Sequence, residues 1–450
     1  MVAFYLLTTF LRFPLLILSR FELTTPVPRS MFLLSQAEKC RLQLPVPEGT
    51  LKTVKQAHHL FDPHGSFDTQ ARHMSEENRP GVFGGFILPW LPAAGAGTIG
   101  AWVWWRNRQP LSTTDAMAGR VCVVTGANAG IGKATAMALA RQGAHVILAC
   151  RSPSKGDAAS RDIRRRVSGA TVQVMPLDLE STESIRGFVK RFRETNLPLH
   201  VLVNNAAGML TGKLETVRGM EKTMVVNHLG PFLLTHLLLP NLQKSAAPHP
   251  LGFGGQCAPE NSLQNDRASC IVNVASRLEK RGELPAAKDP ASATGTVWFQ
   301  PPPGKHDAFR QYGASKLCNM LFTFELHRRL AATTAPASDS GGAGRVTVSA
   351  VTPGMVNTGL GDNIFSPWVR PMIKLSTAPI KALLLRTVDK GAETVVWAAS
   401  SPELEGSSGK FFGDLKECSC SEASQDAELA RKLWEASEVA TGLNESERMA

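Results

Sequence analysis

From Gly119 onward, short apolar runs alternate with longer amphipathic stretches. The apolar runs are rich in β-branched residues and predict seven strands, at 120–125, 145–151, 172–177, 199–203, 270–275, 346–351 and 409–412. The amphipathic stretches predict helices at 131–142, 155–167, 181–194 and 214–242, from residue 312 to about 330, and at 423–439. This alternation favours an α/β fold built on a doubly wound parallel sheet of about seven strands.

A long uncharged stretch precedes the predicted domain. Residues 81–105 carry no charged side chain, and about 20 apolar residues suffice to cross a bilayer as a helix. Arg106 and Arg108 follow directly, so the positive-inside rule places the downstream domain on the cytosolic side. Pro89 and Pro92 interrupt the stretch, which leaves a hairpin or monotopic anchor as the alternative to a full span.

The first 80 residues show no clear periodicity and contain many turn-forming residues. We expect a poorly structured extension there, in which residues 1–73 are dispensable because Met74 begins a self-sufficient stretch. The predicted organisation is therefore an extension at 1–80, a membrane anchor at 81–105 and a folded domain at 119–441.

Composition narrows the classes of partner. The chain has 450 residues, of which 43% are hydrophobic and 19% charged, so a folded protein is expected. The net charge of +11 includes basic clusters at 164–166, 190–191 and 328–329. These clusters predict solvated helix faces, with attraction to an anionic membrane as the alternative. No nucleic-acid-binding motif accompanies them, no metal-ligand spacing stands out, and the scattered cysteines are typical of a reducing compartment.

A glycine-rich turn lies between the first predicted strand and the first predicted helix. Glycine lets the backbone press against a pyrophosphate, and the N-terminus of the following helix offers free N–H groups. This context favours a dinucleotide site. Its candidate residues are Thr125, Gly126, Asn128, Gly130, Ile131 and Gly132.

The second predicted strand ends at Cys150-Arg151 and lacks the acidic residue that binds the ribose 2′-hydroxyl of NAD. A guanidinium suits a 2′-phosphate instead, so Arg151 favours NADP(H), although a solvent-facing role is the alternative. Asp178, just past the third predicted strand, could accept a hydrogen bond from the adenine amine or serve as a cap.

Tyr312 and Lys316 stand four residues apart and share one helix face. A phenol titrates near 10, and a neighbouring ammonium lowers its pKa by favouring the phenolate. Such a pair suits proton transfer to a carbonyl oxygen. Ser276 follows the fifth predicted strand and could polarise the same carbonyl, while Asn227 could support the lysine; each is otherwise a cap or turn residue.

Taken in order, these motifs resemble the short-chain dehydrogenase/reductase family, whose fold is Rossmann-type. The resemblance adds Asn204-Asn205-Ala206 after the fourth predicted strand and Pro353-Gly354 with Thr358 after the sixth. The runs at 226–235 and 315–322 are similar to the retinol dehydrogenase branch of the family.

The resemblance implies a role for each residue. Tyr312 is expected to be the acid/base, Lys316 to bind the ribose and tune Tyr312, Ser276 to orient the carbonyl and Asn227 to support the proton relay. Cofactor contacts are expected from Asn204, Ala206, Pro353, Gly354 and Thr358, besides the turn, Arg151, Asp178, Tyr312 and Lys316.

The implied function is an NADP(H)-dependent oxidoreductase that interconverts a lipophilic aldehyde and alcohol, with retinal and retinol as the leading pair. A steroid or other lipid-aldehyde oxidoreductase and a weakly catalytic, NADP(H)-binding membrane scaffold are the alternatives. The expected location is the endoplasmic reticulum membrane with the domain facing the cytosol, the mitochondrion being the alternative. An oligomer is compatible with the sequence.

Two positions depart from the family pattern. Ala207 stands where the family has a glycine or is an extra residue before Gly208, and its Cβ could crowd the cofactor. Pro231 replaces a histidine in the run Gly-His-Phe. Loop 245–267 is also longer than expected.

Overall fold

The computed structural model of the chain describes residues 116–209, 214–246, 267–284, 295–300, 307–333, 346–356 and 385–449. All of them belong to the unit that spans Gly85–Ala450. The predicted extension at 1–80, the predicted anchor at 81–105 and Thr358 lie outside these residues. No helix in the described part is both long and apolar enough to cross a bilayer.

The described strands form one sheet of eight in the order β10-β9-β8-β7-β4-β1-β2-β3. Every neighbouring pair is parallel except β9 and β10. The strands are β1 (Val121–Thr125), β2 (His145–Cys150), β3 (Val172–Pro176), β4 (Val201–Asn204), β7 (Ser269–Val274), β8 (Val346–Thr352), β9 (Lys410–Gly413) and β10 (Lys416–Glu417). The predicted α/β fold with a doubly wound parallel sheet is confirmed, and the short antiparallel strand β10 is an addition to the seven predicted strands.

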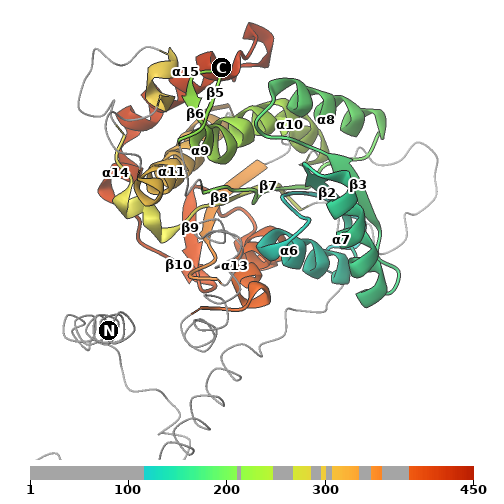
Figure 1. The fold of residues 1–450 in the computed structure, drawn as a ribbon. Helices are drawn as coiled ribbons and strands as arrows, with labels where there is room; N and C mark the ends of the chain where they lie inside the picture. Colours follow the sequence, from blue (N-terminus) through green and yellow to red (C-terminus); the bar gives the residue numbers. More distant parts are fainter. Residues whose placement is uncertain are drawn as a thin grey trace, which may run out of the picture. The chain divides into compact units, whose positions relative to one another are not determined.

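Helices cover both faces of the sheet, as Figure 1 shows. One layer holds α6 (Gly130–Arg141), α7 (Pro153–Arg166) and α13 (Val388–Ser400), and the other holds α8 (Thr182–Glu194), α10 (Gly230–Ala246) and α11 (Ala308–Thr333). Alternate residues of β1 enter different cores: Val121 and Val123 belong to the core with α8 and α10, while Cys122 and Val124 belong to the core with α6 and α13. This period of two follows from the pleat of a strand buried on both faces.

The order of the strands reverses between β1 and β4. The chain moves outward through β2 and β3, then returns to form β4 on the other side of β1. In sheets of this kind ligands bind beyond the carboxyl ends of the strands at such a switch point. The ends of β1 and β4 therefore mark where a site is expected.

The region predicted as one helix at 214–242 has a more varied structure. It begins with a hairpin, β5 (Thr216–Val217) and β6 (Met220–Glu221), whose turn residues Arg218 and Gly219 both have positive φ. Two such residues form the tight turn that matches the twist of a hairpin. After α9 (Lys222–Met224) comes a π-helical turn, η1 (Val225–Leu229), and only then α10.

The predicted tail helix is divided in two. The helix α14 (Glu422–Gln425) ends at Asp426, whose carboxylate accepts hydrogen bonds from the Glu428 and Leu429 N–H groups and so starts α15 (Ala427–Thr441). Apolar residues of α15, Trp434 and Leu433 among them, pack into the core. The sequence interpretation missed the cap at Asp426 and the whole of α13.

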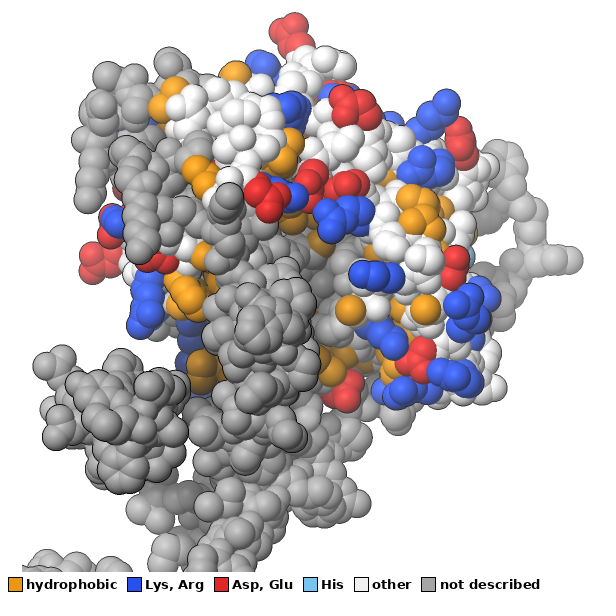
Figure 2. Space-filling view, viewed as in Figure 1, with side chains coloured by type: hydrophobic (Ala, Val, Ile, Leu, Met, Phe, Trp, Pro, Cys, Tyr) orange, Lys and Arg blue, Asp and Glu red, His pale blue; other side chains and the backbone are white. Residues whose placement is uncertain are grey.

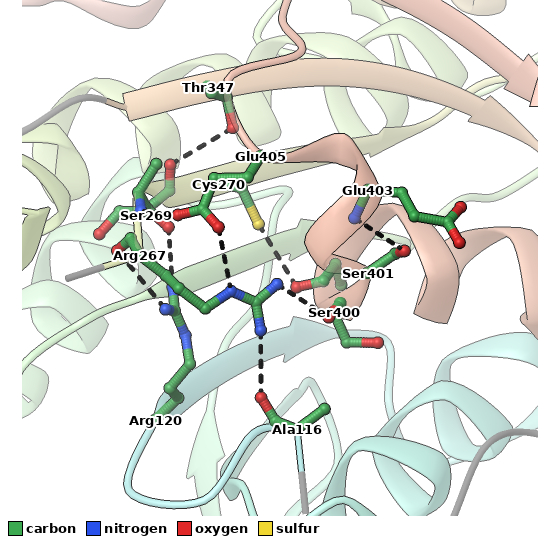
Figure 3. Close-up of polar contacts among 12 residues, drawn as sticks. Ala116, Arg120, Arg267, Ser269, Cys270, Thr347, Ser400, Ser401, Glu403 and Glu405 are labelled. Carbon is green, nitrogen blue, oxygen red and sulfur yellow. Dashed lines mark hydrogen bonds and ion pairs between the residues drawn. The ribbon is translucent and has the colours of Figure 1, made fainter. Parts of the chain in front are cut away.

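Two arginines tie together the amino ends of the strands (Figure 3). Arg267 donates to the carbonyl oxygens of Ala116, at 3.1 Å, and Ser400, at 2.9 Å. Arg120, only 3% exposed, donates to the Ala268 carbonyl at 2.8 Å. These bonds join the start of β1, the start of β7 and the end of α13. They lie at the amino ends of the strands, opposite the switch point.

Lys and Arg side chains gather over the lower right of Figure 2, where Figure 1 places α6 and α7. On α7, Asp162 accepts from Arg165 and Arg166 and also pairs with Lys133 of α6. The hydrogen bonds from these cations hold the pKa of Asp162 well below its usual range. The basic run at 164–166 therefore lies on a solvated helix face and is partly neutralised.

Candidate active site

The glycine turn joins the end of β1 to the start of α6 and is closely fitted. Gly126 and Gly130 have φ of +67° and +56°, a region where a side chain is disfavoured. A Cβ on Gly132 would lie 2.4 Å from the Asn205 Nδ2 atom. Ala129, the N-cap of α6, gives no side-chain hydrogen bond, and the first turn has no acidic residue. The amino end of α6 is therefore suited to an anion.

Thr125 links this turn to the end of β4. Its Oγ1 atom accepts the N–H groups of Asn205, at 3.0 Å, and Ala206, at 2.9 Å, and donates to the Val203 carbonyl at 3.3 Å. The Asn205 amide in turn donates to the Thr125 carbonyl at 2.8 Å. These bonds fix the two strand ends at the switch point.

Asn204 faces away from this turn. Its buried Nδ2 atom donates to Thr235 Oγ1 of α10 at 3.0 Å and to Asn273 Oδ1 of β7 at 2.9 Å. The neighbouring Asn205, which the sequence interpretation did not single out, supplies the side chain that contacts the glycine turn. The Asn204 side chain is thus bonded between α10 and β7 and not to the glycine turn.

Arg151 follows β2 and Asp178 follows β3, both at the carboxyl ends of the strands. Arg151 is exposed, and its Nη1 atom lies 2.7 Å from Oε1 of Glu180. Asp178 accepts the Glu180 N–H at 3.1 Å, and its own N–H donates to Ser184 Oγ at 2.9 Å. The sequence interpretation missed Glu180 as the partner of Arg151. Asn128 in the glycine turn and Ile131 in the first turn of α6 are both half-buried.

Tyr312 and Lys316 lie on one face of α11 and are both buried. The Lys316 Nζ atom lies 5.4 Å from the centre of the Tyr312 ring and donates to the Val274 carbonyl at 2.7 Å. Burial raises the pKa of Tyr312 to about 12 and lowers the pKa of Lys316 to about 7. The sequence predicted that the lysine would lower the pKa of this phenol, but burial outweighs the lysine and raises it. The phenol therefore keeps its proton at neutral pH.

Ser276 follows β7 directly and caps the short helix η3 (Arg277–Arg281), where its Oγ accepts the Leu278 N–H at 3.2 Å. Val274, the partner of Lys316, is only two residues earlier. The end of β7 therefore carries both Ser276 and the acceptor that holds Lys316.

Asn227 sits in the π-helical turn η1 and is 1% exposed. Its amide accepts the Gly208 N–H at 2.7 Å, donates to the Gly208 carbonyl at 2.9 Å and donates to Ser315 Oγ at 3.0 Å. Ser315 then donates to the Tyr312 carbonyl at 2.8 Å. Asn227 thus joins the segment after β4 to the helix that carries Tyr312 and Lys316; π-turns are frequent at functional sites.

The segment after β8 also lies at the carboxyl ends of the strands. Gly354 has φ of +75°, and a Cβ there would lie 3.2 Å from the Arg386 guanidinium. Arg386 is ion-paired with Asp414. Pro353 is half-buried and Gly354 exposed. The candidate residues thus come from the carboxyl ends of β1, β2, β3, β4, β7 and β8, together with α11 and η1.

Comparison with known proteins agrees with this arrangement. The family model described as short chain dehydrogenase matches residues 120–248. Human retinol dehydrogenase 14 is 36% identical over 73% of this chain and 88% of its own length, and human dehydrogenase/reductase SDR family member 13 is 37% identical over 73% and 75%. Mouse polyprenol dehydrogenase is 36% identical over 70% and 82%.

A solved structure supports the fold. An uncharacterized protein of Mycobacterium paratuberculosis is 27% identical and matches with a TM-score of 0.50, over 74% of this chain and 98% of that one. The chain belongs to the short-chain dehydrogenase/reductase family of NAD(P)(H)-binding oxidoreductases and is related to the retinol dehydrogenases.

Proposed function

We propose that this protein is an NADP(H)-dependent oxidoreductase that interconverts a lipophilic aldehyde and its alcohol, with retinal and retinol as the leading pair. The observation that carries the proposal is the buried pair on α11: Tyr312 beside Lys316, with the lysine held by Val274 at the end of β7. Ser276 lies two residues beyond Val274.

The glycine turn fits a dinucleotide. Thr125, Gly126, Gly130 and the uncapped amino end of α6 form a cradle in which a Cβ on Gly132 would collide with Asn205. Arg151 would hold a 2′-phosphate, and Asp178 and the backbone at Ala206 lie at the neighbouring strand ends. When bound, the nicotinamide supplies or accepts the hydride.

Tyr312 would protonate the carbonyl oxygen during reduction, because a buried phenol with a raised pKa keeps its proton at neutral pH. Ser276 would orient the same oxygen through its hydroxyl. Burial lowers the pKa of Lys316 to about 7, so the lysine is partly protonated at neutral pH. In its protonated form, with Nζ 5.4 Å from the centre of the phenol ring, it would favour the phenolate when the alcohol is oxidised. Asn227 holds α11 in register with the segment after β4.

A lipophilic substrate is supported by relatives named for retinol and for polyprenol, both lipid alcohols. We also propose that residues 81–105 anchor the protein in the endoplasmic reticulum membrane, with the domain on the cytosolic side, where such a substrate would be at hand. Extraction of membranes with alkaline carbonate tests this, because deletion of 81–105 should release the protein into the soluble fraction.

The central experiment is NADPH consumption by the purified protein with retinal, a polyprenol-derived aldehyde and a steroid ketone. Retinal should be reduced, and Tyr312→Phe should lower kcat by about 10²- to 10⁴-fold while cofactor binding is retained. Activity confined to the steroid ketone would move the substrate to the steroid class. An unimpaired Tyr312→Phe enzyme would remove the phenol from the chemistry.

A further inference from the structure

A charged cluster lies where β2 and β3 end. Arg151 Nη1 is 2.7 Å from Glu180 Oε1, and the second oxygen of Glu180 is 3.2 Å from Lys222 Nζ. Lys222 also lies 3.0 Å from Oε2 of Glu215. Two cations and two carboxylates thus form a chain with no net charge, in which Glu180 is paired with a cation on each side.

Glu180 is held more firmly than its partner. Its side chain is 21% exposed, whereas that of Arg151 is 67% exposed. A cation flanks each carboxylate oxygen, and the Glu180 N–H is bonded to Asp178. The ion pair itself contributes little to stability, because exposed pairs gain about 0–1 kcal/mol at most. The ion pair therefore has little effect on folding, but it stands at the end of β2.

This position bears on cofactor choice. In dinucleotide-binding sheets the residue after the second strand meets the adenosine ribose, where NADP(H) carries a phosphate and NAD(H) a hydroxyl. A phosphate has a charge of about −1.5 to −2 at pH 7. If Arg151 pairs with it, the fixed carboxylate 2.7 Å from the same guanidinium lies close to the phosphate as well. An uncharged hydroxyl meets no such repulsion and can donate to a carboxylate.

We propose that Glu180 is a specificity-determining residue: it offsets part of the preference for NADP(H) that Arg151 confers, so that the protein also uses NAD(H). This inference rests on the proposed function, because it concerns the cofactor of that same site. A carboxylate about 6 Å from a phosphate of charge about −1.5 to −2 changes the binding constant by roughly six- to tenfold at a water-like dielectric constant of about 80. Glu180→Gln should therefore tighten NADPH binding by about tenfold.

The experiment is titration of the purified full chain with NADPH and with NADH, followed by cofactor fluorescence. Wild type is compared with Glu180→Gln and with Glu215→Gln. Glu215 is the matched control, because it contacts Lys222 at the far end of the chain of charges and its side chain is 55% exposed. Both variants remove one surface carboxylate, and thermal melting checks that they remain folded.

Glu180→Gln should lower the Kd for NADPH by about tenfold, while the Kd for NADH stays within about twofold of wild type or rises. Glu215→Gln should leave the ratio of the two Kd values near that of wild type. An unchanged ratio in Glu180→Gln, weaker NADPH binding, or an equal gain in Glu215→Gln would each overturn the inference. Failure of the wild-type protein to bind either dinucleotide would instead overturn the proposed function. The two failures are thus distinguishable.

Discussion

Gly282 lies against Gly313 with no side chain between their backbones. A Cβ on Gly282 would be 2.5 Å from the Gly313 carbonyl oxygen, and one on Gly313 would be 2.9 Å from the Leu278 carbonyl oxygen. Gly313 follows Tyr312, and Gly282 ends the short helix η3 that Ser276 caps. The close approach of two glycines therefore sets how near η3 and α11 can come, and with it the spacing of Ser276 and Tyr312.

Gly282→Ala should lower kcat by about 10- to 100-fold, because a shift of about 1 Å in a reacting group can cost that much. The new methyl group must push η3 away from α11. Gly187→Ala in α8 is the matched control, since its Cβ would meet only the end of the flexible Arg191 side chain at 3.3 Å. Steady-state kinetics on both variants decide the point, and equal activities would refute the spacing role.

Thr125→Val should weaken cofactor binding and destabilise the fold by roughly 1–3 kcal/mol, because two partly buried N–H groups lose their acceptor. These are the N–H groups of Asn205 and Ala206, which the Thr125 hydroxyl accepts. Thr125→Ser keeps the hydroxyl and should stay near wild type. Urea unfolding together with a cofactor titration measures both effects. A Val variant as stable as the Ser variant would contradict this account.

Tyr312 should remain un-ionised in the free protein up to about pH 10.5, since burial raises its pKa to about 12. Addition of oxidised cofactor should bring phenolate formation to lower pH, because positive charge favours the phenolate. The sequence contains only two tyrosines, so the ultraviolet difference spectrum between wild type and Tyr312→Phe reports this phenol directly. Phenolate absorbance at pH 8 in the free protein would disprove the prediction.

His228 should make the fold sensitive to acid. It is 1% exposed, its Nε2 atom lies 2.8 Å from Ser437 Oγ, and burial lowers its pKa to about 3. Between pH 7 and pH 5 an unfolded histidine, with a pKa near 6.5, takes up a proton that the folded one does not. Stability is therefore lost as pH falls, by about 2 kcal/mol from this residue.

His228→Gln should remove about 2 kcal/mol of the difference between the unfolding free energies at pH 7 and pH 5. Urea unfolding at both pH values measures it. The same loss in wild type and variant would show that His228 is not responsible. Two other buried histidines, His200 and His236, have pKa values lowered to about 4 and should contribute in the same direction.

Local patterns predicted much of the fold and of the site. The parallel strands appear as apolar runs in the sequence, and the spacing of Tyr312 and Lys316 places both on one face of α11. The structure brings Ser276 and Asn227 to elements that contact this helix. The roles of these residues and the cofactor contacts remain predictions.

Features that depend on distant contacts were not visible in the sequence. Glu180 pairs with Arg151 across two strand ends, 29 residues apart. The π-helical turn at Asn227 has no distinctive pattern, because it differs from an α-helix by a single extra residue per turn. Asn204 and Asn205 look equivalent in sequence, yet the pleat of β4 turns the first toward Asn273 and leaves the second at the glycine turn.

Glu279 gives the C-terminal region an influence on the candidate active site. This buried carboxylate on η3 accepts hydrogen bonds from Ser421 and from Ser424 Oγ, the latter at 2.7 Å, so α14 is joined to the helix that Ser276 caps. A chain shortened to end before Ser421 would lose every one of these hydrogen bonds to Glu279 and the helices α14 and α15, which pack on α11. Recombinant truncation at that boundary, or proteolytic loss of the last 30 residues, should therefore impair turnover even though no reacting group is removed.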